Sequence, residues 1–288
     1  MEDLDAILQP GLHDHGSYRS TTDDVADAAI WEHLAGMDPV HAAISVTDED
    51  DEREKTRGLL QTLLAEAVDG VILDVGCGYG RVAKYLLPQR RFPGYVGLDG
   101  SETMLELFDA RYRSRPQEQT TQLVLIRSPV DRLPLVDGSI GNVVVAGVLL
   151  HNTKSVNTRL VAEAYRVLAP GGKLFVLGRD LINARTLGGL QSTLYLRLLR
   201  SRGEGERNGP SHPYSLGEVR TLLGAFSNVR IRGMEFRVLP KRLIALPDAV
   251  TPTYRRLVYE PVQFVADLAT PQPLKRRVPD HWHVIATK

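Results

Sequence analysis

Residues 71–86 read VILDVGCGYGRVAKYL and join an apolar run, an acidic residue, a glycine turn and the start of a helix. The apolar run at 71–75 is typical of a buried strand. Gly76, Gly78 and Gly80 follow at every second position. Glycine tolerates positive φ and places no side chain between the backbone and a ligand. The stretch therefore predicts a strand, a turn and a helix that bring the backbone close to a bound molecule.

The spacing of these glycines indicates which ligand to expect. A dinucleotide site prefers G-x-G-x-x-G, but Arg81 stands where the third glycine would be. Asp74 precedes the turn, and Asp99 ends the next apolar run in YVGLDGS. One carboxylate can accept hydrogen bonds from two ribose hydroxyls, and the other can balance an ammonium group. An adenosyl amino acid fits both, although the glycines alone fit equally well a tight turn without a ligand.

Apolar and amphipathic segments alternate along the middle of the chain, as in a parallel sheet covered by helices on both faces. We expect strands at 71–75, 95–99, 122–127, 142–147 and 173–179, with helices at 80–87, 101–112 and 155–168. Beyond residue 180 this rhythm ends, and we expect helices at 187–198, 215–224 and 250–268 and two final strands at 228–238 and 281–288. Two short helices are expected within residues 20–46. The last two strands are predicted to form an antiparallel edge pair.

Composition narrows the classes of function. Lysine plus arginine and aspartate plus glutamate both number 35, so no overall field attracts nucleic acid. Cys77 is the only cysteine, which excludes an internal disulfide and any zinc site of familiar spacing. The acidic N-terminus lacks a signal-peptide pattern, and no apolar run reaches the roughly 18 residues of a membrane span. We expect a cytoplasmic protein without a metal, a nucleic-acid partner or stable membrane insertion; a homo-oligomer is left open.

Four segments carry a resemblance to a known family: ILDVGCGYG, YVGLDGSETML, SPVDRLPLVDGSIGNVVVAGVLLHN and AEAYRVLAPGGKLFVLGRD. Over roughly residues 68–180 the chain resembles the class I S-adenosylmethionine-dependent methyltransferases, and within them the ubiquinone/menaquinone-type group that acts on small molecules. The resemblance implies an α/β fold with a Rossmann-like, seven-stranded, mostly parallel sheet. The methyltransferase domain would span residues 68–288, after a helical N-terminal extension at 1–67. Helical lid segments would lie at about 181–215 and 240–278.

The resemblance also implies a cofactor, S-adenosylmethionine, and the residues that bind it. The 74–80 loop would surround the methionine part, Asp99 would hold the ribose, and Ser101 with Met104 would line the adenine pocket. The full set is Asp74, Gly76, Cys77, Gly78, Gly80, Asp99, Gly100, Ser101, Met104, Pro129, Val130 and Ala146.

Two positions depart from the family pattern. Relatives carry an acid for the adenine amino group where this chain has Ser128-Pro129-Val130. Adenine recognition would then fall to backbone groups or to Asp131. The common aspartate at the start of the fourth predicted strand is replaced by Gly141.

A sulfonium methyl group is already activated, so alignment and water exclusion matter more than a base. Where the nucleophile must lose a proton, a histidine is suited to accept it. His151, after the fourth predicted strand, is the first candidate, and its alternative role is to line the pocket or cap a turn. His212 is a weaker candidate: with Tyr214 it would reach the cofactor from a lid, and the favoured alternative for both residues is a turn with no chemical role. His281 and His283 are expected to serve the structure.

These observations predict methyl transfer to a small organic acceptor, first an oxygen of a sugar or of a natural-product intermediate in secondary metabolism. The alternatives are an N- or C-methyltransferase of a quinone-like or lipid-like acceptor, a nicotinamide-dependent oxidoreductase, and a noncatalytic cofactor-binding protein.

Overall fold

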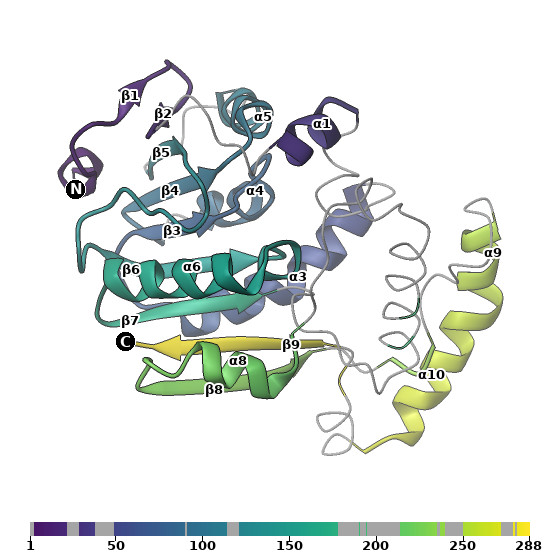
Figure 1. The fold of residues 1–288 in the computed structure, drawn as a ribbon. Helices are drawn as coiled ribbons and strands as arrows, with labels where there is room; N and C mark the ends of the chain where they lie inside the picture. Colours follow the sequence, from purple (N-terminus) through teal and green to yellow (C-terminus); the bar gives the residue numbers. More distant parts are fainter. Residues whose placement is uncertain are drawn as a thin grey trace.

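The computed structural model describes residues 3–21, 29–37, 49–89, 91–113, 121–177, 190, 194, 214–234, 237–239, 250–271, 279 and 281–288. These residues form a nine-stranded sheet in the order β1-β2-β5-β4-β3-β6-β7-β9-β8 (Figure 1). The strands are β1 (His13–Asp14), β2 (Arg19–Ser20), β3 (Ile72–Val75), β4 (Gly94–Asp99), β5 (Gln122–Arg127), β6 (Ile140–Ala146), β7 (Leu168–Leu177), β8 (Asn228–Met234) and β9 (His281–Thr287).

The helices before β6 are η1 (Leu4–Ile7), α1 (Ala29–Met37), α3 (Glu49–Glu66), α4 (Arg81–Leu86), η3 (Leu87–Gln89) and α5 (Glu102–Arg113). Those after it are η4 (Leu149–His151), α6 (Lys154–Val167), α8 (Leu216–Leu222), α9 (Thr251–Tyr254), the π-helix η7 (Arg255–Tyr259) and α10 (Glu260–Ala269). No helix in the described ranges is both long enough and apolar enough to cross a lipid bilayer.

The centre of the sheet is parallel, as the sequence predicts. Strands β5, β4, β3, β6 and β7 pair in parallel, with Asp74 opposite Gly97 on one side and Val144 on the other. The last strand, β9, is antiparallel to both β7 and β8. The mostly parallel sheet and its antiparallel C-terminal edge are therefore confirmed.

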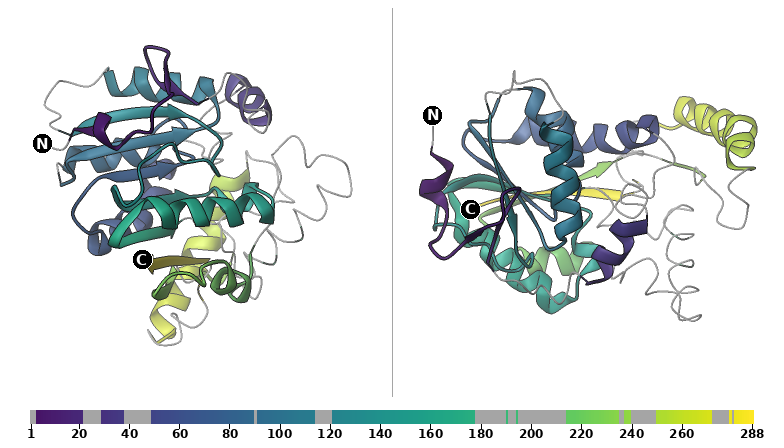
Figure 2. Two further views of the ribbon diagram at one scale, coloured as in Figure 1. Left: turned by 60° about the vertical axis from the view of Figure 1, so that its left-hand side comes forward. Right: turned by 90° about the horizontal axis from the view of Figure 1, so that it is seen from above.

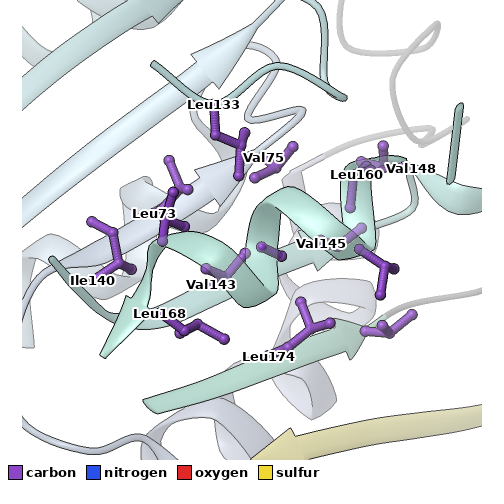
Figure 3. Packing of buried hydrophobic residues seen from close by; sticks show 14 of the residues in the cluster. Leu73, Val75, Leu133, Ile140, Val143, Val145, Val148, Leu160, Leu168 and Leu174 are labelled. Carbon is purple, nitrogen blue, oxygen red and sulfur yellow. The ribbon is translucent and has the colours of Figure 1, made fainter. Parts of the chain in front are cut away.

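Helices cover both faces of the sheet (Figure 2). On one face, side chains of α6 such as Leu160 pack near alternate strand residues, including Leu73, Val143 and Leu174 (Figure 3). Val219 of α8 belongs to the same cluster. On the other face, α3, α4 and α5 pack against the intervening residues, including Ile72 and Val144. Because successive strand residues point to opposite faces, strands buried on both sides need the unbroken apolar runs seen in the sequence.

The N-terminal extension is not wholly helical, and this is where the strand count differs from the expected seven. Residues 13–14 and 19–20 form the antiparallel pair β1 and β2. β2 adds in parallel to β5, with Arg19 opposite Ile126. An unpaired edge strand leaves backbone donors and acceptors open, and this hairpin covers them on β5. Of the two helices expected within 20–46, α1 is present, and residues 22–28 and 38–48 lie outside the described ranges.

Two other expectations concern the C-terminal half. β7 begins at Leu168, before the predicted start at 173, because Pro170-Gly171-Gly172 belongs to the strand as an irregularity in its register with β6. The expected lid at 181–215 lies outside the described residues except for 190, 194, 214 and 215. Within the second expected lid, the helices of residues 251–269 lie to one side of the sheet (Figure 1).

Candidate active site

A cavity opens at the carboxyl ends of the central parallel strands. β3 lies between β4 and β6, and such a switch point is where open α/β sheets bind ligands. The cavity measures about 1050 Å³, including space open to solvent. It is lined by Trp31, Asp74, Gly76, Cys77, Gly78, Tyr79, Arg81, Val82, Asp99, Gly100, Met104, Pro129, Val130, Asp131, Ala146, Gly147, Val148, His151, Asn152 and Val156.

The glycine loop, residues 76–80, forms one wall of this cavity. Gly76 and Gly78 have φ of 70° and 53°, a left-handed conformation that favours glycine. The backbone N–H groups of Gly76 and Cys77 both donate to the Leu98 carbonyl, at 2.7 and 3.0 Å. A Cβ added at Gly78 would meet no protein atom within 4 Å, although Gly78 lines the cavity. The loop therefore presents bare backbone to a ligand.

Asp99 is held at the bottom of the cavity by two backbone donors. Its Oδ2 accepts the Gly78 N–H at 2.8 Å, and its Oδ1 accepts the Ser101 N–H at 2.9 Å. Each carboxylate oxygen can accept a further hydrogen bond. Burial raises the pKa of Asp99, which the two backbone bonds partly oppose. The carboxylate is thus oriented to receive a pair of hydroxyl groups.

Asp74 lies fully buried at the end of β3. Its Oδ2 accepts a hydrogen bond from the Tyr95 hydroxyl, whereas its Oδ1 has no hydrogen-bond partner among the described residues. Burial raises the pKa of Asp74 to about 7, despite the Tyr95 bond and the positive charge of Arg81. A buried acceptor without a partner costs free energy unless a ligand supplies a donor. The orphaned oxygen therefore fits an ammonium group.

Two of the residues predicted to bind the cofactor do not line the cavity. Gly80 faces α5 instead, because a Cβ there would lie 2.7 Å from the Phe108 ring. Ser101 is buried, and its hydroxyl accepts the Met104 N–H at 3.2 Å in the first turn of α5. Both residues shape the site through packing and capping. The other ten predicted residues line the cavity.

The loop after β5 contains Asp131, one of the two candidates for adenine recognition. Pro129, Val130 and Asp131 all line the cavity. Asp131 pairs with Arg159, with 2.7 Å between Oδ2 and Nε. Asp131 therefore lies at the cavity, where Arg159 is its charged partner.

The second departure from the family pattern has a packing reason. A Cβ at Gly141 would lie 2.6 Å from the Asp69 carbonyl oxygen, so an aspartate does not fit this backbone. The neighbouring Asn142 is fully buried and bonds both the N–H and the carbonyl of Val68, at 2.9 and 2.8 Å. These two residues join β6 to the connection that precedes β3.

His151 and Trp31 lie together at the cavity. His151 ends η4 and is half-buried. Its ring meets Trp31 edge to face, with 5.0 Å between the ring centroids and 80° between the planes. Trp31 comes from α1, far away in the sequence, and was missed by the sequence analysis. Its only signal there was an aromatic residue within an amphipathic N-terminal segment.

The other histidines and Tyr214 lie elsewhere. His212 falls outside the described residues. The expectation that Tyr214 reaches the cofactor from a lid is wrong, because Tyr214 is buried in the core and its hydroxyl accepts a hydrogen bond from Asn157 of α6 at 3.0 Å. His283 is buried on β9, with Nδ1 2.9 Å from the Thr62 hydroxyl. It packs in the core, in keeping with a structural role.

Comparison with known proteins identifies the domain. Residues 73–176 match the family of the methyltransferase domain. Two uncharacterised chloroplastic methyltransferases of Arabidopsis thaliana are 34% identical over 108 residues and 33% identical over 120 residues, or 37% and 41% of this chain. The chain spans about a third of the length of these curated relatives, 30% and 33%.

The fold also has solved counterparts. The crystal structure of a SAM-dependent methyltransferase from Archaeoglobus fulgidus superposes with a TM-score of 0.52 at 16% identity, covering 82% of this chain and 94% of that one. Residues 73–176 therefore match a methyltransferase domain, and the fold of the chain is that of a solved SAM-dependent methyltransferase.

Proposed function

We propose that the protein binds S-adenosylmethionine in this cavity and methylates a hydroxyl oxygen of a small natural-product intermediate. The observation that carries the proposal is the buried Asp74 carboxylate, whose Oδ1 lacks a partner among the described residues beside a loop of bare backbone. A zwitterionic amino-acid group would satisfy this oxygen with its ammonium. Arg81, at the same cavity, would balance the carboxylate of that group.

The nucleoside part would lie toward Asp99. The two acceptor oxygens of Asp99 suit the ribose hydroxyls, and Met104, Pro129 and Val130 would flank the adenine ring. Asp131 would accept the adenine amino group. A nicotinamide dinucleotide is less suitable, because Arg81 begins α4 where a small residue should face the pyrophosphate.

When bound, S-adenosylmethionine supplies a methyl group that is already activated for transfer. The chain's own task is to bring the acceptor oxygen into line and to remove its proton. His151 is the described residue best placed for the second task, because an imidazole nitrogen can accept a proton and this one lines the cavity.

Three measurements test the proposal. Saturating S-adenosylhomocysteine should raise the melting temperature, since a ligand at 100 times its Kd adds about 2.7 kcal/mol to stability, whereas NADH should not. Methyl-tritiated S-adenosylmethionine should then label members of a panel of hydroxylated acceptors. His151→Ala should lower kcat by about 10²-fold or more while leaving S-adenosylhomocysteine binding intact. Stabilisation by NADH alone, or an unchanged kcat in His151→Ala, would contradict the corresponding assignment.

A further inference from the structure

We infer that Trp31 and His151 form the acceptor subsite, and that the acceptor is an uncharged planar aromatic compound that is methylated on a ring hydroxyl. The inference rests on the proposed methyl transfer and specifies its substrate class. We call the pair Trp31 and His151 the aromatic corner.

The lining of the cavity extends beyond the groups that we assign to the cofactor. The groups assigned to the cofactor come from β3, β4, the loop after β5 and the first turns of α4 and α5. The lining also includes residues of α1, η4 and the start of α6 with their flanking turns, namely Trp31, Val148, His151, Asn152 and Val156. This second part is available to the acceptor.

The aromatic corner has the shape of a binding surface for a flat ring. The two rings stand at 80° to each other with centroids 5.0 Å apart. A planar molecule can stack on one ring while it meets the other edge to face, and both arrangements are favourable for aromatic pairs. Val148 and Val156 add apolar surface beside the corner.

The charge of the lining disfavours an anionic acceptor. Three carboxylates, Asp74, Asp99 and Asp131, line the described cavity, and Arg81 is the one basic side chain with a permanent charge there. Burial is the largest cause of the raised pKa of Asp99, and the negative charge of Glu32 raises that pKa further. Asp131 is paired with Arg159, so Asp74 and Asp99 are the carboxylates that would repel a phosphate or carboxylate on the acceptor.

Proton chemistry favours a phenol over a sugar. A phenolic hydroxyl has a pKa of about 10, far below the 15.7 or so of water, which an aliphatic alcohol resembles. A neutral imidazole can therefore take the phenolic proton as the new bond forms. The acceptor oxygen forms a bond to the methyl carbon and releases its proton to His151. The bond between the methyl carbon and the cofactor sulfur breaks, and its electron pair stays on the sulfur. Charge and atoms balance without a further reactant.

The residue after Trp31, Glu32, ties α1 to α5. The Glu32 carboxylate accepts the N–H groups of Glu102 and Thr103 in the first turn of α5, the second at 3.2 Å. An anion at a helix N-terminus is favourable. This contact fixes α1 beside the cavity and orients the tryptophan before the acceptor arrives.

Fluorescence tests the inference without turnover. The chain has two tryptophans, so Trp282→Phe leaves Trp31 as the sole reporter. This variant, loaded with S-adenosylhomocysteine, is titrated with catechol, with trans-1,2-cyclohexanediol and with 3,4-dihydroxybenzoate. Catechol should quench Trp31 saturably. The cyclohexanediol, which matches catechol in size and hydroxyl spacing but has no π system, should not, and the benzoate should bind more weakly than catechol.

Two substitutions test whether the aromatic ring of Trp31, and not only its volume, binds the acceptor. By calorimetry, Trp31→Phe should keep catechol binding, and Trp31→Leu should weaken it about three- to tenfold. Binding of S-adenosylhomocysteine should be unchanged in both variants, which also shows that they fold.

The outcomes distinguish this inference from the proposed function. Equal binding of catechol and the cyclohexanediol, no catechol binding to the loaded protein, or an unchanged catechol Kd in Trp31→Leu would overturn the inference while cofactor binding and the proposed function stand. Failure to bind S-adenosylhomocysteine would overturn both.

Discussion

The Tyr95 hydroxyl on β4 donates a hydrogen bond to the Asp74 carboxylate on β3, inside the sheet and beside the cavity. The bond occupies one oxygen of the buried carboxylate and leaves the other for a ligand. It also works against burial, which raises the pKa of Asp74 to about 7. Cofactor binding should therefore depend on pH near neutrality.

We predict that S-adenosylhomocysteine binds more weakly as the pH falls below the Asp74 pKa of about 7. The ionised carboxylate is the form that balances an ammonium group, so the affinity should fall by up to about tenfold per pH unit. Tyr95→Phe removes a bond that stabilises the ionised form and should move the midpoint to higher pH. Calorimetry from about pH 5.5 to pH 8.5 measures both curves, and identical midpoints in the two proteins would contradict the assignment.

Asp74→Asn is the matched control for that experiment. The folded pKa lies above the unfolded value of 3.8, so ionisation destabilises the ligand-free protein progressively from about pH 4 and fully above about pH 7. The variant should bind S-adenosylhomocysteine weakly at every pH. At pH 8 without ligand it should be more stable than the wild type, by on the order of 2 kcal/mol, because the buried charge is gone. Lower stability in urea denaturation would show that the Asp74 carboxylate stabilises the fold.

Gly76 and Gly78 should respond differently to alanine. A Cβ at Gly76 would lie 2.5 Å from Val148 Cγ2, so Gly76→Ala should lower the free energy of unfolding by roughly 1–3 kcal/mol. A Cβ at Gly78 meets no protein atom within 4 Å, so Gly78→Ala should lose ligand binding with the smaller cost of backbone strain alone.

Gly16→Ala supplies the control for strain. Gly16 has φ of 80°, and a Cβ there would also meet nothing within 4 Å, but it lies between β1 and β2, away from the cavity. It should match Gly78→Ala in stability and keep full binding of S-adenosylhomocysteine. Unimpaired binding in Gly78→Ala would remove the glycine loop from the proposed site.

Glu32 should link the position of α1 to the stability of α5. Glu32→Ala removes the carboxylate that accepts the first N–H groups of α5, a loss comparable to an N-cap, of about 0.5–2 kcal/mol. Glu32→Gln keeps one acceptor oxygen and should cost less. In the Trp282→Phe background, Trp31 emission should shift to the red in Glu32→Ala as the indole becomes more exposed. An emission maximum that does not move would show that α1 is held by other contacts.

The buried pair His283 and Thr62 should make stability depend on acid pH. Thr62 donates its one hydroxyl proton to the Gly58 carbonyl at 3.1 Å, so His283 must donate from Nδ1. Burial, with a smaller effect of His281, lowers the pKa of His283 to about 3. The folded pKa of His283 lies below the unfolded value of 6.5. The contribution of the neutral, buried His283 to the free energy of unfolding is therefore complete above pH 6.5, and it falls by up to about 1.4 kcal/mol per pH unit as the pH drops toward 3.

His283→Asn keeps a donor near the position of Nδ1 and cannot titrate. Its unfolding free energy should therefore decline less steeply than that of the wild type between about pH 6.5 and pH 4.5. Asp74 acts in the opposite direction over this range but is shared by both proteins, so it cancels in the comparison. Parallel curves in chemical denaturation would show that His283 is protonated without cost.

The sheet and the glycine-loop end of the cavity were predictable because their signals are local. Strands buried on both faces need long apolar runs, and a backbone that approaches a ligand needs glycine beside an acidic strand end. Asp74, Gly78 and Asp99 lie where these signals placed them.

The remaining features depend on contacts between distant segments. β1 and β2 have two residues each, too few for a periodic pattern, and they form because β5 offers an open edge. Trp31 reaches the cavity through the contact of Glu32 with α5, 70 residues along the chain. Gly80 looked like part of a ligand turn, and only the neighbouring Phe108 ring shows that packing requires it.

The most direct test of the central claim is titration calorimetry of S-adenosylhomocysteine into the wild-type protein and into Asp99→Ala. We predict saturable binding at one site in the wild type. Loss of the hydrogen bonds to the Asp99 carboxylate should weaken binding in the variant by about 1.5–3 kcal/mol, or roughly 10- to 150-fold. No heat of binding in the folded wild type, or an equal Kd in the two proteins, would contradict the assignment of this cavity.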